Sequence, residues 1–366
     1  MNDHRPTGVR VVIPFVFPIL ALAGVGWAQE QYELTDSDAW EVVARPEPGS
    51  PEGALHAART ALAAGQDERA EYLATQWIER HSNHPQLPEA YLLRGDALLA
   101  RDDLYLALFD YEYVARTFHG SEAFVAALER ELAIARKFAT GTKRRLWGMR
   151  IVAAENEAEE LLIRIQERLP GSQLAEEAGL TLGDFYFAQR EMDLAAEMYA
   201  LFIENFPRSR HLRKVRKRLI YAYLASFKGP EFDASGLYEA RTRLQRLKVV
   251  DPVTADQMGA DALLTRIDES DARKLLTTVD WYVRTGDPVA AELVVRRLVR
   301  RYPRSVATVD ALRIIEQITE RLPDAVLAEA PDYASLRAAV LAGEPLPETA
   351  SPPTADDADA SSEPTP

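Results

Sequence analysis

The chain contains no cysteine, which excludes disulfide bonds, thiol chemistry and metal sites with cysteine ligands. We therefore also expect no lipid anchor attached through cysteine. Glycine is scarce, with 18 residues in 366, and no run of alternating apolar and polar residues indicates a set of β-strands. Enzyme signatures are missing as well, since there is no Walker loop, G-x-G-x-x-G, G-x-S-x-G or H-E-x-x-H. These absences predict a helical protein that is not an enzyme and that binds no cofactor.

Positive charge is also in deficit. The 57 acidic residues outnumber the 43 lysines and arginines and give a net charge of −14, which disfavours nucleic acid as a partner. The acidic residues are scattered at the spacing of helix surfaces, and no pocket motif gathers them. His81 and His84 form an H-x-x-H without a third ligand nearby, so we predict a solvated turn there and no metal site.

What the chain does have is one amphipathic unit that recurs along most of its length. An alanine inside a helical pattern marks each copy, at Ala70, Ala107, Ala158, Ala195, Ala240 and Ala291. Twelve residues after the last four of these comes a proline, at Pro170, Pro207, Pro252 and Pro303. Ser82 and His119 stand at that place in the first two copies. Such self-similarity is typical of a tetratricopeptide repeat.

The clearest copy is LTLGDFYFAQREMDLAAEMYALFIENFPRS. In this copy the small residues Gly183 and Ala195 let two antiparallel helices approach closely, while Tyr186 and Tyr199 fill the space around them. Pro207 then ends the second helix. The fold class that we predict is all-α, a tetratricopeptide α-solenoid of about six helical pairs plus a capping helix.

The chain divides into four predicted segments: a signal peptide (1–28), an extended linker (29–52), the solenoid (53–323), and a short helix with a disordered acidic, proline-rich tail (324–366). We expect the helical pairs at 53–82, 87–119, 121–170, 172–207, 210–252 and 254–303, a capping helix at 305–322 and a short helix at 332–342. The repeats are unequal because of three insertions, at 139–150, 227–236 and 254–274. The last of these keeps helical periodicity and should lengthen the first helix of the sixth pair.

The N-terminus has the pattern of an export signal. Arg5 and Arg10 precede or border an apolar run that ends in Gly26-Trp27-Ala28, so we expect cleavage before Gln29. A retained N-terminal anchor is the alternative. Both interpretations place the chain in the periplasm or cell envelope.

The last unit carries a resemblance to a known family. A long helix ends in an aromatic pair and a turn glycine, a second helix ends in Tyr-Pro, and a final helix begins with small residues. The matching positions are Trp281, Tyr282, Gly286, Ala291, Tyr302, Pro303 and Ala311. With these, residues 54–320 resemble the BamD (YfiO) lipoprotein family of the outer-membrane protein assembly machinery. The missing lipidated cysteine is a departure from that family.

The resemblance implies protein partners. The N-terminal units would receive unfolded outer-membrane β-barrel proteins, and the C-terminal units would dock on the β-barrel insertase. Stacked pairs should form a concave groove lined by the first helix of each pair. The candidate groove residues are Leu92, Asp96, Leu99, Leu180, Asp184 and Phe187.

Three basic clusters stand out, at 143–150, 208–218 and 296–304. The first combines Arg145 with Trp147 in an insertion and is a candidate partner anchor. The second we interpret as a solvated face. In the third, Arg296, Arg297, Arg300 and Arg301 lie on a helix. We expect residues 297, 300, 301 and 304 to share an exposed stripe, with Leu293, Val294 and Leu298 facing inward.

Other functions fit a tetratricopeptide array in the envelope. The alternatives are a scaffold for cell-envelope or division complexes, and a factor in polysaccharide export or a peptidoglycan-associated factor. The basic clusters also allow peripheral association with anionic lipid headgroups.

Overall fold

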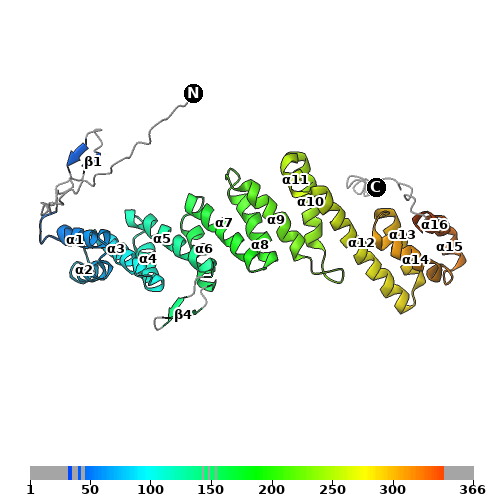
Figure 1. The fold of residues 1–366 in the computed structure, drawn as a ribbon, viewed down its shortest axis with the longest axis horizontal. Coiled ribbons are helices and arrows are strands. Elements are labelled where there is room, and N and C mark those ends of the chain that lie inside the picture. The colour runs from blue at the N-terminus through cyan, green and yellow to red at the C-terminus, as the bar shows by residue number, and fades with distance from the viewer. Residues whose placement is uncertain are drawn as a thin grey trace, which may run out of the picture.

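The computed structural model describes residues 32–34, 40–42, 46–141, 144–146, 149–152 and 155–341. The predicted signal peptide, the tail beyond 341 and Trp147 lie outside these ranges. Within them, consecutive helices stack side by side into one elongated array that runs from α1 to α16 (Figure 1).

Six pairs of antiparallel helices make up the array, as predicted from the repeat. We call the two helices of a pair the first and the second helix, in their order along the chain. The pairs are α1 (Pro51–Ala63) with α2 (Asp67–Arg80), α3 (Leu87–Ala100) with α4 (Leu104–Thr117), α5 (Glu122–Ala139) with α6 (Glu155–Arg168), α7 (Gln173–Ala188) with α8 (Met192–Asn205), α9 (Leu212–Ser226) with α10 (Ser235–Val250), and α12 (Ala260–Thr285) with α13 (Pro288–Arg301). The capping helix α14 (Val306–Thr319) follows.

The structure adds elements that the sequence analysis did not anticipate. The linker contains an antiparallel hairpin of β1 (Tyr32–Leu34) and β2 (Trp40–Val42), and the insertion at 139–150 contains another, of β3 (Arg144–Leu146) and β4 (Met149–Val152). The predicted all-α fold class is confirmed, and these two short hairpins are local additions to it. Two short helices, α11 (Pro252–Met258) and α15 (Asp324–Glu329), are also present. The last helix, α16, spans Tyr333–Leu341.

The insertion at 254–274 does not form one continuous helix. Gly259 adopts a left-handed conformation with φ +66°, which ends α11 and lets α12 begin in a new direction. Because glycine has no Cβ, it adopts this conformation without strain. The long first helix of the sixth pair thus starts at Ala260.

The six marker alanines occupy the contact between the two helices of each pair, and all six are 0% exposed. Glycines mark the closest approach in two pairs. A Cβ built on Gly95 would lie 2.5 Å from the Tyr111 ring, and one on Gly183 would lie 2.7 Å from the Tyr199 ring. The small residues therefore set the distance between the helices, as the repeat predicts.

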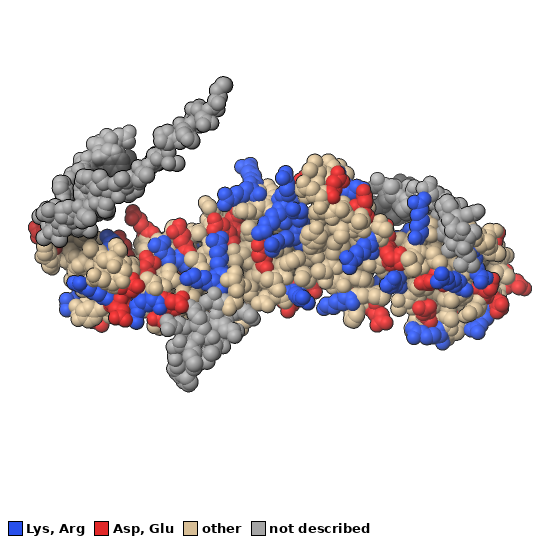
Figure 2. Space-filling model, viewed as in Figure 1, with Lys and Arg blue, Asp and Glu red and all other residues tan. Residues whose placement is uncertain are grey.

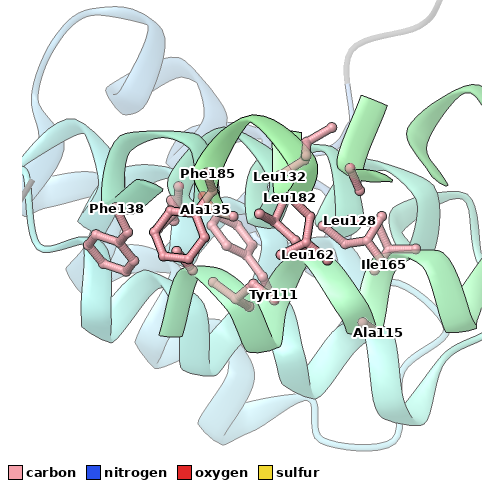
Figure 3. Packing of buried hydrophobic residues seen from close by; sticks show 14 of the residues in the cluster. Tyr111, Ala115, Leu128, Leu132, Ala135, Phe138, Leu162, Ile165, Leu182 and Phe185 are labelled. Atoms are coloured by element: carbon pink, nitrogen blue, oxygen red, sulfur yellow. The ribbon is translucent and has the colours of Figure 1, made fainter. Parts of the chain in front are cut away.

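One continuous apolar cluster fills the middle of the array, from α3 to α9. Figure 3 shows how α5 contributes to it, with Leu128, Leu132 and Phe138 packed among side chains of α6 and α7. Each unit buries its apolar face only against its neighbours, which is how a solenoid is stabilised. A second cluster joins α12, α13 and α14 to Tyr333 of α16.

The C-terminal cap is fixed by a buried polar contact. Glu292 of α13 is 0% exposed and accepts a hydrogen bond of 2.6 Å from the Tyr333 hydroxyl. Arg296 donates to both oxygens of the same carboxylate, at 3.0 and 3.1 Å. The buried charge is therefore paired, as its burial requires, and α16 is attached to the last pair through it.

Candidate functional site

The predicted groove residues Asp96 and Asp184 occupy equivalent places on α3 and α7. Each accepts a hydrogen bond from the tyrosine 15 residues later, Tyr111 at 2.8 Å or Tyr199 at 2.7 Å. Each also forms an ion pair with the arginine 34 residues later: Asp96 pairs with Arg130 at 3.1 Å, and Asp184 pairs with Arg218 at 2.6 Å. Sequence reasoning had placed these carboxylates where a partner would meet them. In the structure they are used to join one unit to the next.

The tyrosine hydroxyls in these contacts are permanent donors. Burial is the main reason that the pKa of Tyr111 and the pKa of Tyr199 lie above the ordinary range, and the neighbouring aspartate reinforces the shift in both. The raised pKa therefore favours the protonated phenols, which donate to Asp96 and Asp184.

Further ion pairs extend these contacts into a ladder, by which we mean the four pairs that join successive first helices. Arg59 of α1 pairs with Glu89 of α3, and Arg136 of α5 pairs with Glu177 of α7 at 2.8 Å. Together with the pairs of Asp96 and Asp184, they connect α1, α3, α5, α7 and α9 in order. The side chains are partly exposed, so each pair contributes only about 0–1 kcal/mol. Their effect is to fix the register between units.

The apolar groove candidates Leu92, Leu99, Leu180 and Phe187 are half-buried and pack against the central cluster. The Arg218 guanidinium lies 5.6 Å from the centre of the Phe187 ring, so this ring already has a cation against it. The first-helix face therefore offers a partner little free apolar surface at these positions.

A larger apolar surface lies on the second helix α4, and sequence reasoning missed it. Four side chains, which we name the α4 stripe, are exposed there: Tyr105 (40%), Leu106 (52%), Phe109 (59%) and Tyr113 (40%). They are spaced three and four residues apart on the face opposite to the buried Leu104, Ala107, Tyr111 and Val114. The signal was present in the sequence LYLALFDYEYV, which is apolar on both faces of the helix.

The hairpin of the insertion contacts the same helix, through β3. Arg145 is in β3, where its Cα partner is Arg150 of β4. The side chain of Arg145 and the whole of Trp147 lie outside the part of the chain that the structure describes. Their role as a partner anchor stays a prediction.

The C-terminal unit presents exposed arginines on α13, including Arg297 and Arg301. Arg301 also lies against the Tyr302 ring, 5.5 Å from its centre. The expected inward face was partly wrong, because Leu293 is 54% exposed. It precedes Arg297 by one helical turn and therefore shares its face. Leu298 is fully buried as expected, and Val294 is half-buried.

A buried group of charges lies between α4, α5 and α6. Glu131 is 0% exposed and pairs with Arg168 at 3.3 Å, while Arg168 also donates to Glu112 at 2.7 Å. Burial is the main cause that raises the pKa of Glu131 to about 8; the Arg168 guanidinium opposes this shift and the neighbouring Glu112 adds to it. These ion pairs connect α4, α5 and α6 inside the array, so we interpret the group as structural. Among the described residues no cluster of His, Asp and Glu is arranged to hold a metal ion, and no helix is long and apolar enough to cross a membrane.

Comparison with known proteins supports the resemblance found in the sequence. Residues 152–331 match the family model YfiO, described as an outer membrane lipoprotein. The predicted resemblance to that family is confirmed over this range. No curated protein matches the chain.

Several solved structures match the chain. One, titled as a functional characterization of Pseudomonas aeruginosa PilF, is 14% identical, covers 71% of this chain and 95% of its own, and has a TM-score of 0.30. The type IV pilus biogenesis factor PilW is 14% identical, with coverage of 73% and 100% and a TM-score of 0.28. The tetratricopeptide domain of P58(IPK) is 18% identical, with coverage of 80% and 84% and a TM-score of 0.26.

Proposed function

We propose that this YfiO-like tetratricopeptide array is an exported scaffold of the cell envelope that acts in outer-membrane protein assembly. It would bind apolar segments of unfolded β-barrel proteins with its N-terminal units and dock on the barrel insertase with its C-terminal unit. The observation that carries the proposal is the family match over residues 152–331, which includes the docking unit. The α4 stripe supplies the surface for cargo.

Contiguous exposed apolar side chains mark a surface that another molecule covers. The α4 stripe has three aromatic rings among its four side chains. Two of them, Tyr105 and Phe109, pack edge to face with their ring centres 5.0 Å apart. Such a face suits the apolar side chains of an extended or helical segment. Leu92, Leu99, Leu180 and Phe187 remain secondary candidates on the first-helix face.

For the C-terminal unit, the exposed Arg297 and Arg301 favour an acidic partner. Opposite charges across an interface raise the association rate and make it sensitive to salt. The neighbouring Leu293 adds an apolar side chain to the same face. Docking on an insertase would therefore combine charge with a small apolar contact.

The proposed location rests on the N-terminal export pattern and on the outer-membrane family. In this proposal the protein associates with the membrane peripherally, through partners or through basic side chains on lipid headgroups. Intact-mass analysis of the protein from its host should show a chain that begins at Gln29. A mature chain that keeps residues 11–27 would contradict export by cleavage.

Co-purification tests the two binding roles separately. Phe109→Ser should reduce crosslinking to an unfolded barrel protein, whereas the matched change Tyr238→Ser, at an exposed ring on α10 (50%), should not. Arg297→Glu with Arg301→Glu should lose the insertase and keep the cargo. If the double variant keeps every partner, the docking assignment is wrong. Division or glycan-export proteins in place of insertase subunits would favour the alternative scaffolds.

A further inference from the structure

A pocket opens between α8, α9 and α10, away from both surfaces considered so far. It encloses about 180 Å³. Its floor is apolar, formed by leucine and isoleucine side chains of the three helices and by Val250. Its wall carries three arginines, Arg216 of α9 with Arg243 and Arg246 of α10. An apolar floor with cations at the wall favours a ligand that has an apolar group next to an anionic one.

Two of the three arginines of this pocket are not neutralised by the array itself. Among the described residues, no ion pair involves Arg216 or Arg246. Arg243 pairs with Glu239 at 3.2 Å, but its Nε is buried without a hydrogen-bond partner. Arg216 and Arg246 are exposed, so their guanidinium groups are available to an anionic group supplied from outside.

The basic cluster at 208–218, interpreted from sequence as a solvated face, thus has two parts. Arg213, Lys214 and Arg218 are used within the array, in ion pairs with Asp251 and Asp184. Arg216 lines the pocket instead. Figure 2 shows that Lys and Arg side chains gather in this central region of the array.

The pocket and the ladder lie on different faces of α9. Arg216 and Arg218 are two residues apart, so they point about 200° apart around the helix axis. Arg218 belongs to the ladder and Arg216 to the pocket. A ligand can therefore occupy the pocket without breaking the contacts between first helices.

We propose that this pocket binds a peptide segment of a partner protein in which one large apolar side chain stands next to carboxylates. A cavity of about 150 Å³ accommodates a benzene-sized group, so one aromatic side chain fits the floor. The carboxylates would pair with Arg216 and Arg246, which line the pocket and are exposed. The site adds an acidic partner to the proposed function and does not depend on it, because it uses neither the α4 stripe nor α13.

Fluorescence anisotropy with the full chain tests the proposal. The probe is a short fluorescein-labelled peptide with one phenylalanine between two aspartates. We expect saturable binding that weakens about tenfold or more when the phenylalanine becomes alanine, and likewise when both aspartates become asparagines, since each charge-assisted contact corresponds to about one decade in Kd.

Two matched pairs of variants locate the binding. Arg216→Glu should abolish it, whereas Lys217→Glu makes the same charge change on the same helix outside the pocket and should preserve it. Val250→Trp should fill the pocket and block binding, whereas Val249→Trp places the same side chain at an 83% exposed neighbour outside the lining and should not. Thermal melting of each variant confirms that it is folded.

The proposal is overturned if the two members of either pair behave alike, because binding would then reflect diffuse charge. It is also overturned if the peptide without phenylalanine binds as well as the probe, or if no peptide binds at millimolar concentration. Anionic phosphatidylglycerol vesicles form a separate arm. Binding to vesicles that requires Arg216 while the peptide does not bind would assign the pocket to lipid and contradict a peptide site.

Discussion

Replacing Gly183 by alanine should destabilise the array, although alanine is the better helix former. A Cβ at this position would lie 2.7 and 2.8 Å from two carbons of the Tyr199 ring. The ring cannot move aside easily, because it is 0% exposed and its hydroxyl is hydrogen-bonded to Asp184 at 2.7 Å. Overpacking of this kind costs about 1–3 kcal/mol, and the rigid ring places the cost near the upper end. The higher helix propensity of alanine offsets about 1 kcal/mol of this cost, so the free energy of unfolding should fall by about 2 kcal/mol.

The same helix provides the control. A Cβ on Gly179 would meet only the end of the flexible Gln166 side chain at 2.9 Å and a ring carbon of Phe202 at 3.6 Å. Gln166 can rotate away, so Gly179→Ala should be neutral or stabilising by up to about 1 kcal/mol. The two alanine variants should then differ by about 2–3 kcal/mol, or several degrees in melting temperature.

Urea and thermal denaturation followed by circular dichroism would measure the difference. A double variant that adds Tyr199→Leu removes the ring and should make Gly183→Ala harmless, which is the signature of a direct contact in a double-mutant cycle. If Gly183→Ala and Gly179→Ala are equally stable, the close approach of α7 and α8 described above is wrong, and with it the reason for a small residue at this position of the repeat.

Three further predictions concern the core and the cap. The pKa of Glu131, raised by burial to about 8, means that its protonated form stabilises the fold fully below about pH 4.5 and progressively less as the pH rises through 8. The melting temperature of Glu131→Gln should therefore depend less on pH between about 5 and 8 than that of the wild type. If the melting temperatures of both proteins change equally with pH across that range, the reasoning is wrong. Ala195→Leu should lower stability by about 1–3 kcal/mol, whereas Ala262→Leu at an exposed site of α12 should not; equal melting would argue against the repeat register. Tyr333→Phe leaves the buried Glu292 without one donor, at a cost of about 1–3 kcal/mol, and limited proteolysis should then cleave the chain after α14 sooner than in the wild type.

The order of the helical pairs could be predicted because it depends on local periodicity. The marker alanines and the close approach at Gly183 follow from one helical pattern repeated along the chain, and all six alanines are buried as that pattern requires. The break at Gly259 could not be predicted with the same rule, because apolar periodicity continues across it. The strands at 144–146 and 149–152 are too short to be recognised from alternation.

The candidate site was harder to predict, because it depends on contacts between units. Asp96 and Asp184 were correctly placed on first helices, yet their partners lie 34 residues away on the next first helix. That spacing is one repeat length, so opposite charges one repeat apart are the signal that would have revealed these two pairs of the ladder. The exposure of Leu293 shows a different error, since assigning an inward face from apolar character alone ignores which residue the neighbouring helix covers.

The ladder also explains why we expect partners to bind on other faces of the array than the groove between first helices. A partner that entered the groove between first helices would compete with the ion pairs of Asp96 and Asp184 and with the cation that lies on Phe187. Breaking a partly buried pair leaves a charge uncompensated, so such a partner would lose part of its binding free energy. The α4 stripe and the pocket at Arg216 lack this cost, because the side chains of the stripe are exposed and, among the described residues, no ion pair involves Arg216. We therefore expect variants of the ladder to change stability first, and variants of second-helix surfaces to change partners at constant stability.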